Sequence, residues 1–279
     1  MSTLPTQTHS SWSLADIVNL ERYPIDALDT DRGRELISWC RAQFVDSVSC
    51  ELPAFIRPDA IESVINDVES REAHAFRSSR QRSAYGFYSP SHSETPEVSE
   101  DDPHAALQWR DVCYLGYDEF DAGSVLHALY ESEEVCAFSA AVLGLPEVHT
   151  VADPLMAAPI SLHYEGCQLG WHCDTQEFTI TVMFRTSEAG GLFEYVPLAG
   201  PGDANFECVP EVFNGDRTLV RSVDIQPGSI VLFRGANTLH RVTPTQGGKP
   251  RVLCVFHLEQ KPGRIYPDQW KIDVFGRPR

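Results

Sequence analysis

Hydrophobic residues in the first half of the chain recur at helical spacing in three segments. The first follows Asp29-Thr30-Asp31, whose side chains could cap a helix, and the second begins at Pro58. The third, from Ser124 to Leu143, has the most regular pattern and stops before Gly144. A short apolar stretch from Ser47 to Leu52 is typical of a strand. The first half of the chain is therefore predicted to be mainly helical.

Strand-like segments dominate after residue 150, and Gly-Gly, Pro-Gly or Gly-Gly-Lys-Pro turns separate them. In one of them, apolar residues alternate with Thr179, Thr181 and Met183, which predicts a strand with one buried face. The predicted strands are Ile160–His163, Phe178–Phe184, Leu192–Val196, Ser229–Phe233 and Val252–His257. Short strands joined by regular turns favour a β-sandwich or a jelly roll.

The 279 residues suit a single domain. We predict one domain with helices first and a β-sandwich or jelly roll second. In this division residues 1–150 form the mainly helical part, residues 151–260 form the jelly roll, and residues 261–279 form a C-terminal tail.

Residues 85–104 are rich in serine, proline and acidic side chains, so they bury little surface and are predicted to form a long loop. Two interpretations of this loop stay open. It is either a solvated excursion on the surface or a lid over the functional site. The aromatic residues Tyr85, Phe87 and Tyr88 at its start are compatible with a lid.

Charge and composition exclude several classes of partner. The formal net charge of −18, with only three lysines, disfavours nucleic-acid binding, because that binding depends on Lys and Arg neutralising phosphates. No apolar run approaches the ~20 residues of a membrane span, and residues 1–15 lack a signal-peptide pattern. The eight cysteines contain no CxxC pair and are typical of free thiols in a reducing compartment. We expect a cytoplasmic protein, and the sequence indicates no oligomeric state.

The residues that can carry chemistry gather around His172 and Asp174. Side chains at i and i+2 of an extended segment leave the same face, so both can reach one ion. A second histidine, His240, follows the predicted strand Ser229–Phe233. Two histidines and one carboxylate form the facial triad of non-haem Fe(II) oxygenases, although zinc accepts the same ligands. Arg251 opens the last predicted strand, where a buried guanidinium would form a bidentate pair with a carboxylate.

The order HxD, then His, then Arg resembles the Fe(II)/2-oxoglutarate-dependent oxygenases. The resemblance is closest to the group that acts on free amino acids, which includes amino-acid hydroxylases and radical halogenases. It extends from about residue 20 to residue 258, and the matching stretches are LERYPIDALD, VADPL, GWHCDTQEF, EAGGLFEYVP, PGSIVLFRGANTLHRVTP and KPR.

This resemblance implies an α+β fold in which a double-stranded β-helix (jelly-roll) core is flanked by N-terminal helices. It also implies a role for each matching residue. His172, Asp174 and His240 would hold Fe(II), and Arg251 would bind the distal carboxylate of the cosubstrate 2-oxoglutarate. The serine commonly found two residues after that arginine is Leu253 here, so Thr181 or Thr243 is expected to supply the missing contact. His163 is a further candidate for contact with 2-oxoglutarate.

The implied reaction consumes O2 and 2-oxoglutarate, releases succinate and CO2, and hydroxylates a carbon of the substrate. The halogenases of the group have a small residue where the carboxylate stands, so Asp174 argues against halogenation. Desaturation and oxidative cyclisation stay open. The resemblance and the acidic composition favour a small amino acid as substrate, in secondary metabolism. Leu155 and Leu169, close to the motif, favour a substrate with an aliphatic side chain. Gln168 and Glu177 flank the motif and are either contacts for the substrate ammonium group or solvated positions at the rim.

Two other functions compete with this interpretation. A member of the same superfamily that modifies nucleic acid or protein is disfavoured, in its nucleic-acid version, by the net charge. A non-catalytic jelly-roll module that keeps the metal ligands for structural reasons would bind metal without consuming 2-oxoglutarate.

Overall fold

The fold was analysed in a computed structural model, which describes residues 12–47, 49–85, 102–174, 176–200 and 202–279. Residues 86–101, the middle of the predicted loop 85–104, lie outside the described residues. The prediction that this loop is a lid therefore concerns residues that the structure does not describe.

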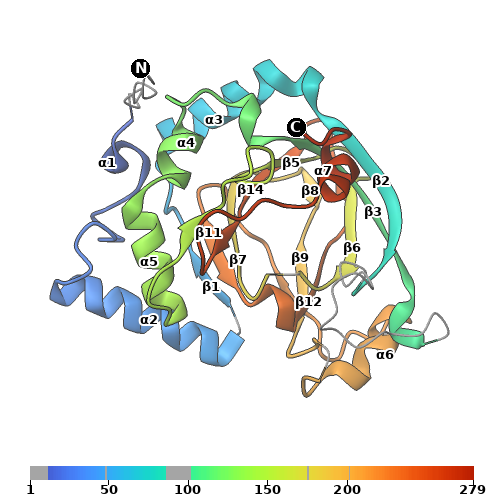
Figure 1. The fold of residues 1–279 in the computed structure, drawn as a ribbon. Helices are drawn as coiled ribbons and strands as arrows, with labels where there is room; N and C mark the ends of the chain where they lie inside the picture. The colour runs from blue at the N-terminus through green and yellow to red at the C-terminus, as the bar shows by residue number, and fades with distance from the viewer. Residues whose placement is uncertain (1–11, 48, 86–101, 175, 201) are drawn as a thin grey trace.

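One large antiparallel sheet curls around the centre of the molecule (Figure 1). Within the described residues it has 11 strands in the order β1-β11-β7-β14-β5-β3-β6-β12-β9-β10, with β2 paired to β3. Its strands are β1 Ser49–Leu52, β2 Phe76–Ser83, β3 Leu107–Leu115, β5 Ile160–His163, β6 Gln168–His172, β7 Thr179–Arg185, β9 Phe193–Pro197, β10 Arg221–Val223, β11 Ile230–Phe233, β12 Thr238–Val242 and β14 Arg251–Phe256. Two small pairs add β4 His149–Thr150 with β15 Leu258–Glu259, and β8 Ala189–Gly190 with β13 Thr245–Gln246. This arrangement confirms the predicted jelly-roll core.

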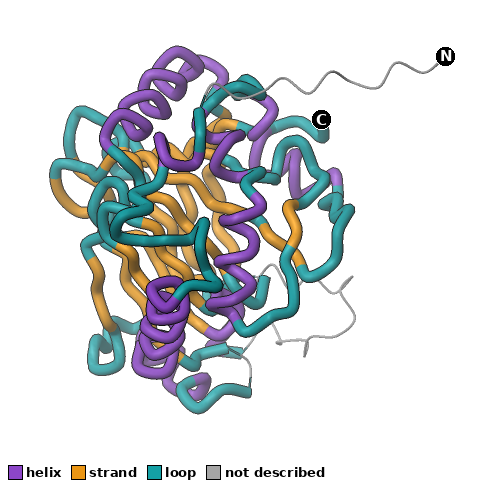
Figure 2. The backbone as a smooth tube through the Cα atoms, turned by 90° about the vertical axis from the view of Figure 1, so that its left-hand side faces the viewer, coloured by secondary structure: helices purple, strands orange, loops and turns teal. Residues whose placement is uncertain are grey.

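Helices cover the outside of the curled sheet, as the side view in Figure 2 shows. The N-terminal helices pack on the strands through their apolar faces and share one large core with them. The helices are α1 Leu14–Ile17, α2 Asp31–Ser47, α3 Pro58–Arg71, α4 Val125–Tyr130, α5 Glu133–Leu143, α6 Val209–Phe213 and α7 Asp268–Phe275. None of the helices in the described part is both long and apolar enough to cross a lipid bilayer.

The alternation in β7 and β14 separates an outer core from an inner one. Ile180 and Val182 of β7 are fully buried against the helices, which stabilises the fold by about 1.5–3 kcal/mol for each such side chain. Met183 of β7 and Leu253 of β14 point the other way, into a smaller cluster inside the curled sheet. The inner face is therefore free to carry polar groups at the positions that this cluster does not fill.

The N-terminal half contains more strand than its sequence pattern predicts. Strands β2 and β3, eight and nine residues long, pair along their whole overlap and join the main sheet through β5 and β6. The segment FRSSRQRS of β2 carries polar and charged residues on both faces, so hydrophobic alternation does not reveal it. Two strands of the jelly roll, β2 and β3, thus come from residues 1–150, the part of the chain predicted to be mainly helical.

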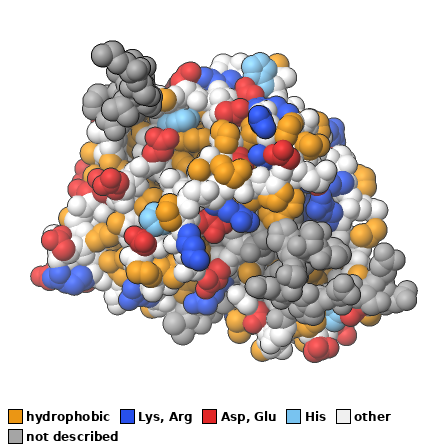
Figure 3. All heavy atoms as spheres, in the orientation of Figure 1, with side chains coloured by type: hydrophobic (Ala, Val, Ile, Leu, Met, Phe, Trp, Pro, Cys, Tyr) orange, Lys and Arg blue, Asp and Glu red, His pale blue; other side chains and the backbone are white. Residues whose placement is uncertain are grey.

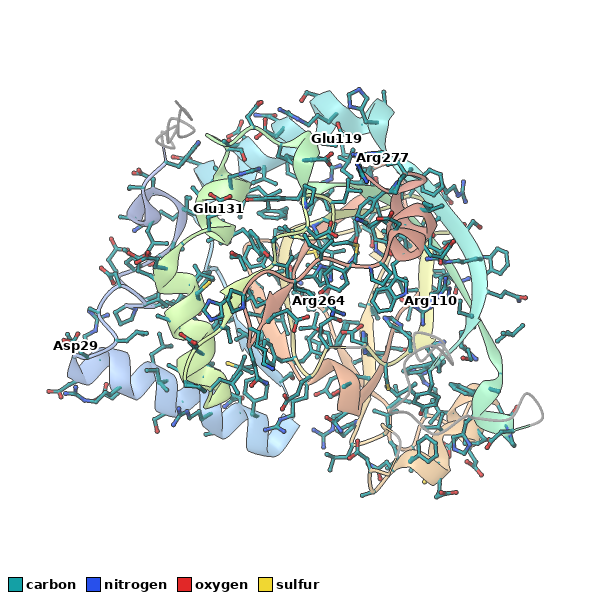
Figure 4. The ribbon with its side chains drawn as sticks, viewed as in Figure 1. Asp29, Arg110, Glu119, Glu131, Arg264 and Arg277 are labelled. Atoms are coloured by element: carbon teal, nitrogen blue, oxygen red, sulfur yellow. The ribbon has the colours of Figure 1, made fainter. Side chains whose placement is uncertain are left out.

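Two other elements differ from their predictions. The helix expected over Ser124–Leu143 is divided into α4 and α5, because Ser132 adopts an extended backbone and its hydroxyl accepts a hydrogen bond from the Val135 N–H as a new N-cap. The predicted C-terminal tail contains α7, which packs against β2 and β3. Ion pairs from Arg277 to Asp118 and Glu119 hold the end of this helix (Figure 4).

Charged side chains of both signs are interspersed on the molecular face of Figure 3. The net charge of −18 is therefore not gathered into one acidic patch on this face.

Candidate functional site

Three potential metal ligands come together inside the curled sheet. His172 ends β6 and lies opposite His240 of β12 in the strand register, and Asp174 follows two residues after β6. Oδ1 of Asp174 lies 3.8 Å from Nε2 of His172 and 3.6 Å from Nε2 of His240. One ligand atom from each residue lies within 4.8 Å of the others. Two imidazoles and one carboxylate in this arrangement can hold a divalent metal ion and leave its remaining positions open.

Backbone carbonyls orient both imidazole rings. Nδ1 of His172 donates to the carbonyl oxygen of Gly170 and Nδ1 of His240 donates to that of Thr238, each at 2.8 Å. With the proton on Nδ1, the lone pair of each ring sits on Nε2, the atom nearest Asp174. Burial lowers the pKa of His172 well below its ordinary value, which keeps this ring neutral. The donor set is thus prepared for a metal such as Fe(II).

The carboxylate of Asp174 is held by its surroundings. The hydroxyl of Thr179 donates to Oδ2, which leaves Oδ1 facing the two histidines. The backbone N–H of Asp174 donates to the carbonyl of Gly235 at 3.1 Å. Gly235 permits this close approach because a Cβ at that position would lie 2.5 Å from Oδ2 of Asp174 and 2.6 Å from the Thr179 hydroxyl. Glycine is thus required beside the carboxylate for steric reasons.

The substitution Gly235→Ala is expected to weaken divalent-metal binding by about 10-fold or more, because the new Cβ displaces the Asp174 carboxylate. Titration of the apo protein with Co(II), a spectroscopic substitute for Fe(II), measures this effect. Gly123→Ala is the matched control, because a Cβ there meets no atom within 4 Å. Equal Co(II) affinity in the two variants would show that Gly235 does not shape the site.

Arg251 and His163 form a second polar group in the interior. They lie opposite each other on β14 and β5, and only 2% and 0% of their surfaces are exposed. Burial lowers the pKa of Arg251 to about 10, and burial together with the nearby Arg251 lowers the pKa of His163. Within the described residues, Nη1 of Arg251 and both ring nitrogens of His163 have no hydrogen-bond partner. Buried polar atoms of this kind are costly unless a ligand satisfies them, and a carboxylate suits both groups.

The two threonines considered beside Arg251 have different surroundings. Thr181 of β7 lies on the same face as Met183, opposite Val255 and Val231, so its half-buried hydroxyl lies on the inner side of the sheet. The hydroxyl of Thr243 accepts a hydrogen bond from the Leu192 N–H at 3.0 Å. Thr243 is therefore engaged by the backbone.

A cavity of about 160 Å³ opens beside His172 and Asp174. One part of its wall is basic and comes from β2 and β3, and another part is apolar. Helix α7 of the predicted tail closes a third side. The basic lining residues are Arg80, Arg82 and Arg110, the apolar ones are Met156, Pro159, Leu169, Leu253 and Val255, and those of α7 are Trp270, Asp273 and Val274.

The basic wall is partly neutralised. Oδ2 of Asp273 lies 2.9 Å from Nη1 of Arg80 and also pairs with Arg82. Arg110 of β3, labelled in Figure 4, lies opposite Leu169 of β6 and is so deeply buried that its pKa falls to about 10. Two cations and one carboxylate at one end, with a further guanidinium nearby, favour an acidic group on a ligand.

Of the residues proposed from the sequence to choose the substrate, only Leu169 lines this cavity. Leu155 is fully buried and packs against Gly116 in the core. Gln168 lies opposite Asp111 in the β3–β6 register, and Glu177 lines a different surface hollow with Arg234. Proximity in sequence to the metal motif therefore does not bring a side chain into the cavity.

Sequence reasoning missed the arginines, Thr179 and α7. Arg80 and Arg82 are two residues apart, the spacing that puts two side chains on one face of a strand, and this signal could have revealed them. Nothing in the sequence places Asp273 or Trp270 beside a motif that lies about a hundred residues earlier.

Solved structures of the same fold include several oxygenases. An oxidoreductase of the 2OG-Fe(II) oxygenase family from Burkholderia pseudomallei aligns with a TM-score of 0.51 and 12% identity, covering 81% of this chain and 92% of that one. The α-ketoglutarate-dependent epimerase SnoN from nogalamycin biosynthesis aligns with a TM-score of 0.51 and 12% identity, over 80% and 81% of the two chains. AviO1 from Streptomyces viridochromogenes Tue57 has a TM-score of 0.52 and 18% identity, over 79% and 93%. At these identities the likeness shows the fold alone.

Sequence comparison adds a family. No curated protein matches the chain. The family described as HalD, Halogenase D, matches residues 114–262, which is more than half of the chain. The matched range begins in β3 and contains the three potential metal ligands and Arg251. The chain therefore belongs to the Halogenase D family and has the fold of the 2OG-Fe(II) oxygenases.

Proposed function

We propose that this protein is a non-haem Fe(II)/2-oxoglutarate-dependent dioxygenase that hydroxylates a C–H bond of a free amino acid or a small amino-acid derivative. One observation carries the proposal. Two imidazoles with fixed tautomers and one carboxylate lie close enough together inside the jelly roll to bind one metal ion, next to a substrate-sized cavity. When bound, iron with 2-oxoglutarate and O2 supplies the oxidising power, and 2-oxoglutarate leaves as succinate and CO2.

The chain's own residues divide this task. His172, Asp174 and His240 would hold the metal. Arg251, assisted by His163, would hold the distal carboxylate of 2-oxoglutarate, since the buried guanidinium and imidazole lie side by side on paired strands. The apolar part of the cavity wall, which includes Leu169, Leu253 and Val255, would exclude water from the reacting carbon.

Hydroxylation is proposed although the family is named for a halogenase. A halide ligand needs a metal position of its own, and here Asp174 stands among the ligands, with its other oxygen bonded to Thr179. Desaturation and oxidative cyclisation use the same residues and are the alternative outcomes.

The cavity supports an amino acid with an aliphatic side chain. Arg80, Arg82 and Arg110 supply positive charge for a carboxylate, and Leu169, Leu253 and Val255 supply an apolar surface for the side chain. A side-chain ammonium would find little compensation, because the wall carboxylate Asp273 already pairs with two arginines.

The test is a coupled assay. The purified protein is incubated with Fe(II), 2-oxoglutarate, ascorbate, chloride and single amino acids, and succinate and product masses are recorded. The proposal expects succinate formation stimulated by one or a few aliphatic amino acids, with a product that gains one oxygen. Loss of two hydrogens would indicate the alternative outcomes, and incorporation of chlorine would contradict the role given to Asp174. Metal binding without amino-acid-dependent succinate would favour a non-catalytic module.

A further inference from the structure

Trp171 and Arg241 lie directly behind the two histidine ligands. Trp171 precedes His172 in β6, and Arg241 follows His240 in the paired strand β12. Because neighbouring residues of a strand point to opposite faces, both side chains lie on the face of the sheet away from the histidine rings. Cζ of Arg241 lies 4.7 Å from the centroid of the Trp171 ring, within the range of a cation–π contact. The outer sides of the two ligand strands are thus in contact with each other.

Glu194 of β9 completes the contact. It lies opposite Arg241 in the β12–β9 register, and its Oε2 accepts a hydrogen bond of 2.6 Å from Nε of Arg241. Glu194 is 7% exposed, and hydrogen bonds from Arg217 and Arg241 outweigh burial and lower its pKa, so it stays ionised. The Trp171–Arg241–Glu194 stack therefore crosses three strands, β6, β12 and β9.

The strand register needs this support at the point where the stack lies. His240 pairs with His172, but Val242 pairs with Leu169, so β6 has one more residue than β12 between the two pairs. Such a β-bulge interrupts the ladder hydrogen bonds locally and redirects side chains. Gly170 within the bulge fits tightly, because a Cβ there would lie 2.6 Å from the carbonyl oxygen of Trp109. Backbone pairing alone is therefore weakest one residue away from a metal ligand.

We propose that the Trp171–Arg241–Glu194 stack is a positioning device for the metal site, which holds β6 and β12 in register across the bulge and so sets the separation of the two imidazoles. This inference rests on the metal site of the proposed function and assigns it residues that never touch the metal. Arg241 is the central member, since it alone contacts both Trp171 and Glu194 from a ligand strand.

Arg217 provides a matched comparison. It also pairs with Glu194, and its Cζ lies 5.8 Å from the Trp171 ring centroid, but it comes from the segment between α6 and β10 and its side chain is 44% exposed. Loss of Arg217 removes one cation from Glu194 without releasing a ligand strand. Loss of Arg241 removes the other cation and releases β12 from β6.

The experiment compares Arg241→Met, Arg217→Met and the unsubstituted protein by Co(II) titration of the apo forms, with the visible ligand-field spectrum as a second readout. Urea unfolding of each apo form measures stability separately. We expect Arg241→Met to lose about 10-fold in Co(II) affinity with an altered spectrum, as for other residues that orient metal ligands. Arg217→Met is expected to stay within about 2-fold, with a similar loss of stability.

Equal losses of Co(II) affinity in the two variants, or no loss in either, would overturn the proposal. If Arg241→Met does not fold, Arg241→Lys replaces it. This variant keeps the charge and loses the planar fork, so weaker Co(II) binding with native circular dichroism is expected and unchanged binding contradicts the proposal. Absence of Co(II) binding by the unsubstituted protein would overturn the proposed metal site itself, and this inference with it.

Discussion

The substitution Asp174→Ala is expected to abolish 2-oxoglutarate turnover and to lower metal affinity by more than about 100-fold. Residues that merely orient a metal ligand contribute about 10–100-fold to affinity, and Asp174 supplies a ligand oxygen itself. The two histidines would remain in place, because their orienting hydrogen bonds come from the carbonyls of Gly170 and Thr238. Co(II) titration measures the affinity, and succinate formation measures the turnover.

The control for this prediction is Asp29→Ala, which removes an exposed carboxylate near the start of α2, at the edge of the molecule (Figure 4). It is expected to leave metal binding unchanged. Thermal unfolding of the apo Asp174→Ala protein shows whether the fold persists. Metal affinity that survives in Asp174→Ala at the unsubstituted level would mean that the histidines bind the ion with some other ligand.

The substitution Arg251→Met is expected to raise the KM for 2-oxoglutarate by about 100-fold while metal affinity stays within about 2-fold. Truncating one partner of a buried charge pair costs about 2–5 kcal/mol, and every 1.4 kcal/mol is about tenfold in affinity. Methionine keeps the apolar stem, so β14 can pack as before. Initial rates at varied 2-oxoglutarate concentration, with iron saturating, test this expectation.

Arg251→Met has a second expected effect, on stability. Burial lowers the pKa of Arg251 to about 10, so the unfolded chain holds this proton more tightly than the folded protein. Without 2-oxoglutarate, folding works against the charged form, and Arg251→Met is expected to unfold at the same or a higher temperature. Arg264→Met, which changes a partly exposed arginine, is the control. For the first effect, a KM for 2-oxoglutarate that is unchanged in Arg251→Met would mean that other residues bind the cosubstrate.

The sequence was informative where chemistry and local pattern coincide. Short alternating strands predict a β-sandwich or a jelly roll, and β7 follows the alternation, because Ile180 and Val182 pack in one core and Met183 packs in another. The metal ligands are recognisable because His172 and Asp174, whose spacing alone also occurs by chance, are followed in order by His240 and Arg251. Strand alternation is a pattern within one short segment, and the metal ligands are recognised from the order of short segments along the chain.

The cavity was not predictable in the same way, because its wall is assembled from distant segments. Strand β2 carries Arg80 and Arg82 where a buried strand would have apolar residues, so periodicity identified no strand there. Helix α7 is short and lies in the predicted tail, yet its Asp273 pairs with both arginines. Leu155 and Glu177 lie near the metal motif in sequence, but packing places Leu155 in the core and Glu177 in a separate hollow. Tertiary contacts, which no local pattern encodes, decide these positions.

The most direct test of the central claim is the visible charge-transfer absorption that forms when 2-oxoglutarate chelates Fe(II) in a protein. The apo protein is mixed anaerobically with Fe(II) and then titrated with 2-oxoglutarate. The account predicts a saturable band in the unsubstituted protein, no band in Asp174→Ala, and a band that saturates only at about 100-fold higher 2-oxoglutarate in Arg251→Met. No band in the unsubstituted protein, at Fe(II) concentrations where the metal is shown to be bound, would contradict the assignment of this site to Fe(II) and 2-oxoglutarate.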